Sequence, residues 1–317
     1  MRSSTPNFQF RYQFNQQAVQ SQYPSNIFAT TYPLIAINIR ERGDQMIAIT
    51  KKYLEQMNAS ANDKVQMIQY IAGDTVLDVG IGGGVLGKLI RSRKPCINVI
   101  GVDKKISSHT EDRLSFYHDV FELDARELQK EIEVGEVDTV IFSSVLHEVF
   151  SYNGYSIEAV YEALKSAYNI IPKGGRIIIR DGVKMEDNSK VQIKFKNPND
   201  LQKSAQFATD FKARQIELTI GDYDSVTMPM NDAMEFLYTY TWGDKDYERE
   251  VKEQYGLFTP KEYIAAVKDL LDLELVTYNH YLQEGHNRHL SRKVELFDEE
   301  GRRTRFPDSN ILLVFQK

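Results

Sequence analysis

The sequence predicts an α/β fold built on a doubly wound, mostly parallel sheet, and three features indicate it. Apolar runs at 76–79, 97–102 and 137–142 have the length and composition of buried parallel strands. They alternate with helical patterns, as βαβ units require. The first run is followed by a turn that contains Gly80, Gly82, Gly83 and Gly84. A glycine-rich turn from strand to helix predicts a nucleotide site, because glycine lets the backbone take positive φ angles and approach a ligand closely.

Length, composition and charge narrow the class of protein. A chain of 317 residues, 42% of them hydrophobic, can bury a large core. Its single cysteine, Cys96, excludes an internal disulfide and a cysteine-based zinc cluster. No apolar run reaches the roughly 20 residues that span a bilayer, and no signal peptide begins the chain, so we expect a cytoplasmic protein with no membrane partner. The net charge of −6 disfavours a broad nucleic-acid surface.

The N-terminal region, residues 1–72, is expected to form an arm and a helical cover. Residues 1 to about 30 are rich in Gln, Asn and Ser, yet aromatic residues alternate at period two between 8 and 14. That alternation fits either a β-arm on the body or on a second subunit, which would make a homodimer, or a loosely attached tail. From 32 to 71 the pattern is helical, with capping residues at 62–63 before a shorter second helix.

The spacing of the glycine-rich turn narrows the choice of cofactor. A dinucleotide fingerprint fits Gly82, Gly84 and Gly87, but that match alone is weak. The fuller pattern is an acidic residue on the strand and alternating glycines, Asp78-x-Gly80-x-Gly82-x-Gly84. In this pattern the chain resembles the class I S-adenosylmethionine-dependent methyltransferases. The resemblance implies that the glycine backbone lies against the methionine part of S-adenosylmethionine, and that Asp78 orients the loop or meets the amino group of the cofactor.

Two further segments predict contacts to the adenosine part. Asp103 ends the second strand and lies 25 residues after Asp78. This spacing fits one βαβ unit, because the strand, helix and return strand take about 30 residues in all. A carboxylate there can accept both ribose hydroxyls, in S-adenosylmethionine and in NAD alike. The resemblance also implies that Asp124 reaches the adenine amino group, with Asp119 as the alternative, and that the neighbouring Ala125 backbone meets a ring nitrogen.

A polar cluster at the end of the 137–142 strand supplies the candidate chemistry. Ligands of open α/β sheets bind outside the carboxyl ends of the strands, so Ser143, Ser144, His147 and Glu148 are expected beside the cofactor, with Glu148 as a candidate substrate contact. His147 is the candidate general base for a hydroxyl, because its intrinsic pKa is near neutral, and a structural histidine is the alternative. Asp181 ends the fifth strand, 176–182, and either contacts substrate or caps the next segment.

The methyltransferase resemblance implies seven strands, with the last one antiparallel. A helix at 259–271, a strand at 273–281 and a strand at 311–315 complete that set. We therefore expect a cofactor-binding core at 73–182, an inserted cap at 183–258 that selects the substrate, and the completion of the sheet at 259–317, with a hairpin insertion at 293–306.

Substrate contacts are expected from both insertions. Tyr240 lies in the aromatic-rich centre of the cap, and His280 begins a loop that also holds His286 and His289. The spacings of six and three residues between these histidines match no common ligand set, so no metal is expected. Lys184, Lys190, Lys194, Lys196 and Arg214 would favour RNA if they formed one basic face.

These features together predict an enzyme that transfers a methyl group from S-adenosylmethionine to an oxygen or nitrogen atom of a small molecule. The donor is already activated, so the protein must align the acceptor and exclude water, and it needs a base only for a protonated acceptor. Three alternatives remain at this point: an NAD(P)-dependent oxidoreductase, a non-catalytic S-adenosylmethionine-binding scaffold, and a methyltransferase that acts on RNA or protein.

Overall fold

The computed structural model describes residues 61, 63–106, 114–222 and 224–317. The predicted aromatic arm at 8–14 and most of the predicted helical cover lie outside these residues. Residues 63–68 form the end of a helix that precedes the first strand. No helix of the described ranges is long and apolar enough to cross a membrane.

Seven strands form the main sheet, in the order β3-β2-β1-β4-β5-β12-β9. All neighbours are parallel except β12, which runs antiparallel to both β5 and β9. This arrangement is that of class I methyltransferases and confirms the predicted fold class. The strands are β1 (Thr75–Val79), β2 (Asn98–Asp103), β3 (Asp119–Glu122), β4 (Thr139–Ser143), β5 (Arg176–Gly182), β9 (Glu274–Tyr281) and β12 (Asn310–Gln316).

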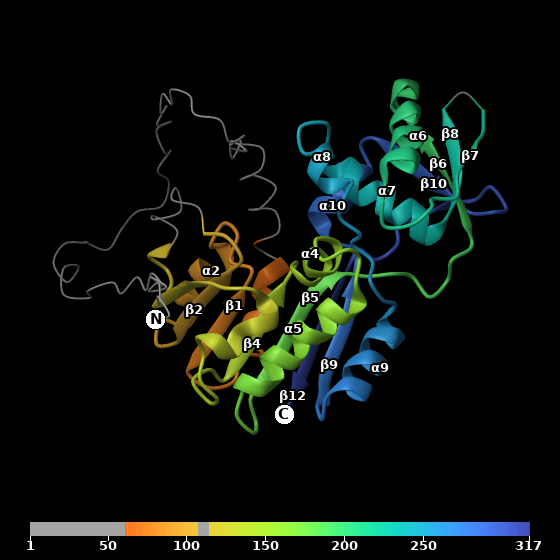
Figure 1. The fold of residues 1–317 in the computed structure, drawn as a ribbon. Helices are drawn as coiled ribbons and strands as arrows, with labels where there is room; N and C mark the ends of the chain where they lie inside the picture. The colour runs from red at the N-terminus through yellow and green to blue at the C-terminus, as the bar shows by residue number, and fades with distance from the viewer. Residues whose placement is uncertain (1–60, 62, 107–113, 223) are drawn as a thin grey trace, which may run out of the picture.

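Helices cover both faces of this sheet, as a doubly wound fold requires (Figure 1). On one face, alternate strand residues pack against α5 (Ile157–Ile170) and α9 (Pro260–Leu270). On the other face, the remaining strand residues pack against α2 (Val85–Arg93) and the 63–68 helix. The α9 helix begins with a capping box, in which Thr259 and Glu262 exchange side-chain and backbone hydrogen bonds.

A second sheet, in the order β11-β10-β6-β8-β7, lies beyond the ligand-side end of the main sheet (Figure 1). It joins the inserted region to the predicted 293–306 hairpin, a pairing that the sequence did not predict, and it has its own core. The strands are β6 (Lys190–Phe195), β7 (Thr219–Ile220), β8 (Ser225–Pro229), β10 (Val294–Phe297) and β11 (Arg303–Thr304). The helices around it are η3 (Pro198–Asp200), α6 (Leu201–Asp210), α7 (Met230–Trp242), α8 (Tyr247–Glu250) and α10 (Glu284–Leu290).

Two short helices follow strands of the main sheet at its ligand side. They are η2 (Ala125–Lys130), which follows β3, and α4 (Leu146–Ser151), which follows β4. The α4 helix therefore begins at the carboxyl end of the central strands, where open α/β sheets bind their ligands.

Candidate active site

The glycine-rich turn connects β1 to α2 and borders two neighbouring cavities. Gly80 has a φ of 77°, and a Cβ on it would lie 2.6 Å from the Val145 side chain, so glycine is required there. A Cβ on Gly82 would meet nothing within 4 Å, so the turn is open on that side. The larger cavity, of about 280 Å³, and the smaller cavity, of about 150 Å³, are both lined by Gly80 and Gly82.

The smaller cavity gathers the residues that were predicted to hold an adenosine. Asp103 lies at the end of β2, and its carboxylate accepts hydrogen bonds from the backbone N–H groups of Gly82 and Lys105, at 3.1 and 3.2 Å. Asp124 and Ala125 also line this cavity. The cavity thus brings two carboxylates together at the ends of β2 and β3.

Asp124 is held more firmly than the sequence indicated. Its carboxylate accepts from Arg126 Nε at 2.9 Å and Nη2 at 3.0 Å, and it caps η2 through the Arg126 N–H. Lys104 Nζ lies 3.3 Å away. These hydrogen bonds, those from Arg126 above all, keep the pKa of Asp124 well below its usual range, so its carboxylate stays ionised.

Asp78 is buried below the turn and has one hydrogen-bond donor in the described structure, the Tyr117 hydroxyl at 2.6 Å. The Tyr117 ring fits there because Gly87 has no side chain: a Cβ on Gly87 would lie 2.5 Å from that ring. Burial raises the pKa of Asp78 from 3.8 to about 6, against the lowering effect of the Tyr117 hydroxyl and of Lys64. Asp78 therefore carries a carboxylate that lacks a full set of partners.

Replacing Asp78 with Asn should stabilise the ligand-free protein at neutral pH. The wild-type pKa is raised on folding, so the cost of ionising Asp78 is absent below its unfolded pKa of 3.8 and complete above about 6. That shift corresponds to roughly 3 kcal/mol. We expect the gain in the free energy of unfolding to grow with pH across this window in urea titrations. A gain that is the same at all pH values would contradict this account.

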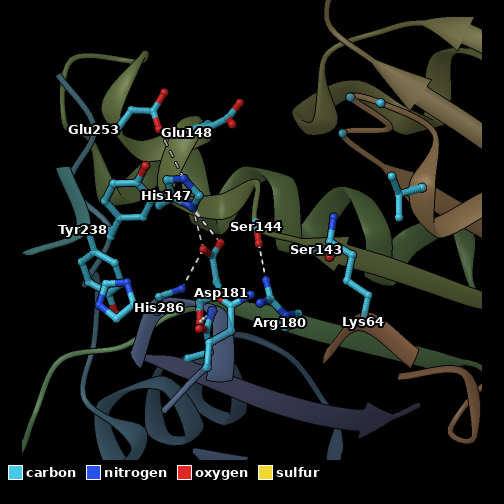
Figure 2. A pocket seen from close by; sticks show the side chains of 18 of the residues that line it. Lys64, Ser143, Ser144, His147, Glu148, Arg180, Asp181, Tyr238, Glu253 and His286 are labelled. Carbon is cyan, nitrogen blue, oxygen red and sulfur yellow. Dashed lines mark hydrogen bonds and ion pairs between the residues drawn. The ribbon is translucent and has the colours of Figure 1, made fainter. Parts of the chain in front are cut away.

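Lys64 is a cavity residue that the sequence analysis missed, because the helix before β1 carries no motif. Its side chain lines the larger cavity with Asp78 and Gly82, beside Ser143 (Figure 2). Burial, followed by the charge of Arg180, lowers the pKa of Lys64 to about 8. Within the described ranges no carboxylate lies at ion-pair distance from its ammonium, although Asp78 attracts it from farther away. Lys64 and Asp78 thus offer opposite charges to one ligand.

Arg180, in contrast, has partners of its own. It forms an ion pair with Asp63 and donates to Ser144 Oγ. Ser144, which has a positive φ of 58°, also donates its backbone N–H to the Arg180 carbonyl at 2.7 Å. Ser143 lies next to it in the larger cavity, and its buried hydroxyl has no hydrogen-bond partner among the described residues.

His147 and Asp181 meet at the start of α4, as Figure 2 shows. His147 Nδ1 lies 2.5 Å from Asp181 Oδ1, and the other oxygen of Asp181 accepts from the backbone N–H groups of Leu146 and His147, at 2.9 and 3.2 Å. His147 Nε2 lies 3.5 Å from Glu253 Oε2. Burial alone would lower the pKa of His147, but the negative charges of Asp181 and Glu253 outweigh it and hold the pKa well above 6.5.

Two glutamates complete this group. Glu253 comes from the inserted region and accepts a hydrogen bond from the Tyr152 hydroxyl at 2.7 Å. Glu148 lines both cavities and remains accessible, but its partial loss of hydration raises its pKa to about 7. His147, Glu148 and Glu253 offer ligand atoms within 4.8 Å of one another, a spacing that a metal ion could also bridge. The expected absence of a metal stays a prediction.

The wall opposite the glycine-rich turn comes largely from the inserted region and α10. The Tyr255 ring stacks on His147 at a centroid distance of 4.5 Å, Tyr238 stacks on Tyr255 at 4.7 Å, and His286 packs on Tyr238 at 5.3 Å. Trp242, Arg249 and His289 also line this cavity. We call His147, Tyr255, Tyr238 and His286 the ring column.

The structure does not bring two of the predicted substrate contacts, Tyr240 and His280, to the larger cavity. Tyr240 donates its hydroxyl to Asp200 at 2.6 Å and lines a separate cavity between α6 and α7, because it faces the second core. His280 lies on the exposed edge strand β9 and pairs with Asp308 at 2.7 Å, outside both cavities at the glycine-rich turn. Tyr238 on the same helix as Tyr240, and His286 and His289 on α10, line the larger cavity instead.

Known proteins to which this chain is similar include methyltransferases. No protein-family model matches the chain. The curated ribosomal RNA large subunit methyltransferase G of Colwellia psychrerythraea is 24% identical over 162 residues, a match that covers 49% of this chain. This chain spans only 41% of that relative's length.

Solved structures of similar fold include the pyocyanin biosynthetic protein PhzM, with a TM-score of 0.48 and 11% identity, over 86% of this chain and 60% of PhzM. A putative methyltransferase in complex with the Haloferax volcanii Trm112 activator has a TM-score of 0.47 and 13% identity, over 84% of this chain and 92% of that one. In the order of its sheet and in its glycine-rich motif, this chain resembles the class I S-adenosylmethionine-dependent methyltransferases.

Proposed function

We propose that this protein is an S-adenosylmethionine-dependent methyltransferase that acts on a hydroxyl or amino group of a small molecule. The observation that carries the proposal is the pair of cavities at the glycine-rich turn: one lined by Asp103 and Asp124, the other by Asp78, Lys64 and the His147–Asp181 pair. A nucleoside with a zwitterionic amino-acid tail matches that division of charge. S-adenosylmethionine supplies a methyl group bound to a sulfonium, which needs no further activation.

The residues of the two cavities fit this cofactor. The smaller cavity would hold the adenosine, with Asp103 toward the ribose hydroxyls and Asp124 and Ala125 toward the adenine. In the larger cavity, Asp78 would face the ammonium of the amino-acid part and Lys64 its carboxylate, and the open side of Gly82 leaves room for the ligand backbone. Ser143 and Ser144 lie between these groups and α4.

His147 is the proposed general base. Asp181 binds its Nδ1 side, which fixes the ring and leaves Nε2 for the proton of the acceptor. In the free enzyme the carboxylates hold the imidazole protonated. A cationic ligand in the same cavity would lower the pKa of His147, because like charges disfavour each other, and so would favour the neutral base. Glu253 then stabilises the imidazolium that forms when the proton arrives.

An RNA acceptor is the second candidate, because the curated relative is named as an RNA methyltransferase. The basic residues that would favour RNA are, however, largely paired within the protein. Lys190 pairs with Glu217 at 2.6 Å, Lys194 with Asp224 at 3.6 Å, and Arg214 with Asp232. Lys196 donates to the Ser291 carbonyl at 2.9 Å. The small-molecule acceptor therefore fits the charge distribution better.

Transfer of a radiolabelled methyl group tests the proposal. The protein is incubated with methyl-labelled S-adenosylmethionine and, separately, with a small-molecule extract, total RNA and total protein. We expect label in the small-molecule fraction, and label there at a rate at least about a hundredfold lower with the His147→Asn variant. Label in RNA or protein alone would show that the acceptor is a macromolecule and not a small molecule. No transfer to any fraction would contradict the proposed methyltransferase activity.

A further inference from the structure

The far end of the ring column carries a histidine whose hydrogen bonds are only half used. His286 lies on α10 and is 6% exposed, and it lines the larger cavity. Figure 2 shows it beyond Tyr238 from His147. Its Nδ1 lies 3.2 Å from Thr241 Oγ1, whereas its Nε2 has no hydrogen-bond partner in the described structure.

The Thr241 hydroxyl decides which nitrogen of His286 carries the proton. That hydroxyl donates to the Leu237 carbonyl, one helical turn earlier, at 2.8 Å. Since its only proton is used there, Thr241 Oγ1 must accept from His286, and Nδ1 must be the N–H. His286 Nε2 is then a buried lone-pair acceptor, on a ring that lines the larger cavity.

His286 is not protonated near neutral pH, so Nδ1 remains the donor and Nε2 the acceptor. Burial, with a further contribution from His289, lowers the pKa of His286 to about 3. The ring therefore stays neutral, and Nε2 accepts a hydrogen bond but cannot donate one. A buried acceptor without a donor is destabilising, so a ligand that supplies the donor gains affinity.

Neighbouring polar groups of the ring column cannot supply that donor. The Tyr238 hydroxyl donates to the Ser309 carbonyl, and the Tyr255 hydroxyl donates to Glu250. The faces of both rings are covered by their neighbours in the ring column, so the rings offer their edges to the cavity, while their hydroxyls bind elsewhere in the protein. The two ends of the column are then the groups that can accept from a ligand: His286 through Nε2, and His147 once a cationic ligand favours its neutral form.

We propose that His286 Nε2 binds an O–H or N–H group of the methyl acceptor that is distinct from the group that becomes methylated. This inference rests on the proposed function and names its substrate class: a flat molecule with two donors, one at His147 and the other at His286, with the two tyrosine rings between them. The edges of those rings favour contact with the face of an aromatic or otherwise planar body. An acceptor whose second donor is blocked leaves Nε2 unpaired, and sites of this kind discriminate strongly against such analogues.

A pair of probes tests the inference: a biphenyl with a hydroxyl at both para positions, and its mono-methyl ether. Each is added to protein that is saturated with S-adenosylhomocysteine and labelled with ¹⁵N-histidine, and the His286→Gln variant assigns the His286 signals. We expect a neutral ring with the proton on Nδ1, and an Nε2 signal that shifts more with the diol than with the ether. A proton on Nε2, equal shifts, or no shift with either probe would overturn the proposal.

Variants separate a hydrogen bond from simple packing. His286→Phe keeps a ring against Tyr238 but removes the acceptor, whereas His286→Gln restores an acceptor through its side-chain carbonyl. We expect the Kd of the diol to rise at least tenfold in the Phe variant and to recover in part in the Gln variant. S-adenosylhomocysteine should bind all three proteins equally. If it binds none of them, the proposed function fails; if only the diol result fails, this inference fails alone.

Discussion

Replacing His147 with Asn is expected to lower kcat for methyl transfer by about two to four orders of magnitude, which is the usual contribution of a general base. The Kd of S-adenosylhomocysteine should change little, because no adenosine or amino-acid contact is removed. The physical reason is the geometry of the imidazole: Asp181 holds Nδ1 at 2.5 Å, and Nε2 faces the cavity and Glu253. The measurement is single-turnover transfer of labelled methyl to the acceptor fraction.

The chain offers a matched control for that variant. His280 also pairs with an aspartate, at 2.7 Å from Asp308, but it lies on the exposed edge strand β9, outside the larger cavity. His280→Asn should therefore leave kcat unchanged. Equal losses of kcat in the two variants, or full activity of His147→Asn, would show that His147 is not the general base. The rate of methyl transfer would then come from alignment of the acceptor.

Replacing Lys64 with Met is expected to weaken S-adenosylhomocysteine binding by about 10- to 100-fold, the effect of losing one charge-assisted hydrogen bond. Methylthioadenosine has the same nucleoside and sulfur but lacks the amino-acid carboxylate, so its affinity should stay the same. The expectation follows from the position of Lys64 in the larger cavity, where the described structure gives its ammonium no carboxylate at ion-pair distance.

The control for this variant is Lys88→Met. Lys88 lies on α2, directly after the glycine-rich turn, but its ammonium is over the Phe116 ring and outside both cavities. The Lys88→Met variant should bind S-adenosylhomocysteine and methylthioadenosine with unchanged affinity. Calorimetric titration of the two ligands measures the difference, and an equal loss for both in Lys64→Met would indicate a structural role for Lys64.

The cofactor side could be predicted from the sequence because local chemistry fixes it. A strand, four glycines and a helix produce the turn around Gly80, and one βαβ unit brings Asp103 to the same edge of the sheet. The ends of β4 and β5 are neighbours for the same reason, which is why His147 and Asp181 could both be named, although their contact could not.

The acceptor side depends on contacts that no local pattern encodes. Tyr238 and Tyr240 are two residues apart on α7 and point in different directions, and only the packing of the second core decides which one faces the cavity. The pairing of β6 with β10 carries α10 into position, and with it His286. The spacing of His286 and His289, three residues apart on one helix face, was the available signal. Glu253 belongs to no motif, so no signal in the sequence indicated that it would lie in the site.

The central claim is that the glycine-rich turn binds S-adenosylmethionine, and calorimetric titration of the purified protein with S-adenosylmethionine and with NADH tests it most directly. We expect that S-adenosylmethionine binds, that Asp103→Ala weakens this binding strongly by removing the carboxylate at the end of β2, and that NADH gives no heat. Binding of NADH without binding of S-adenosylmethionine would contradict the account and make the protein a nicotinamide-dependent enzyme.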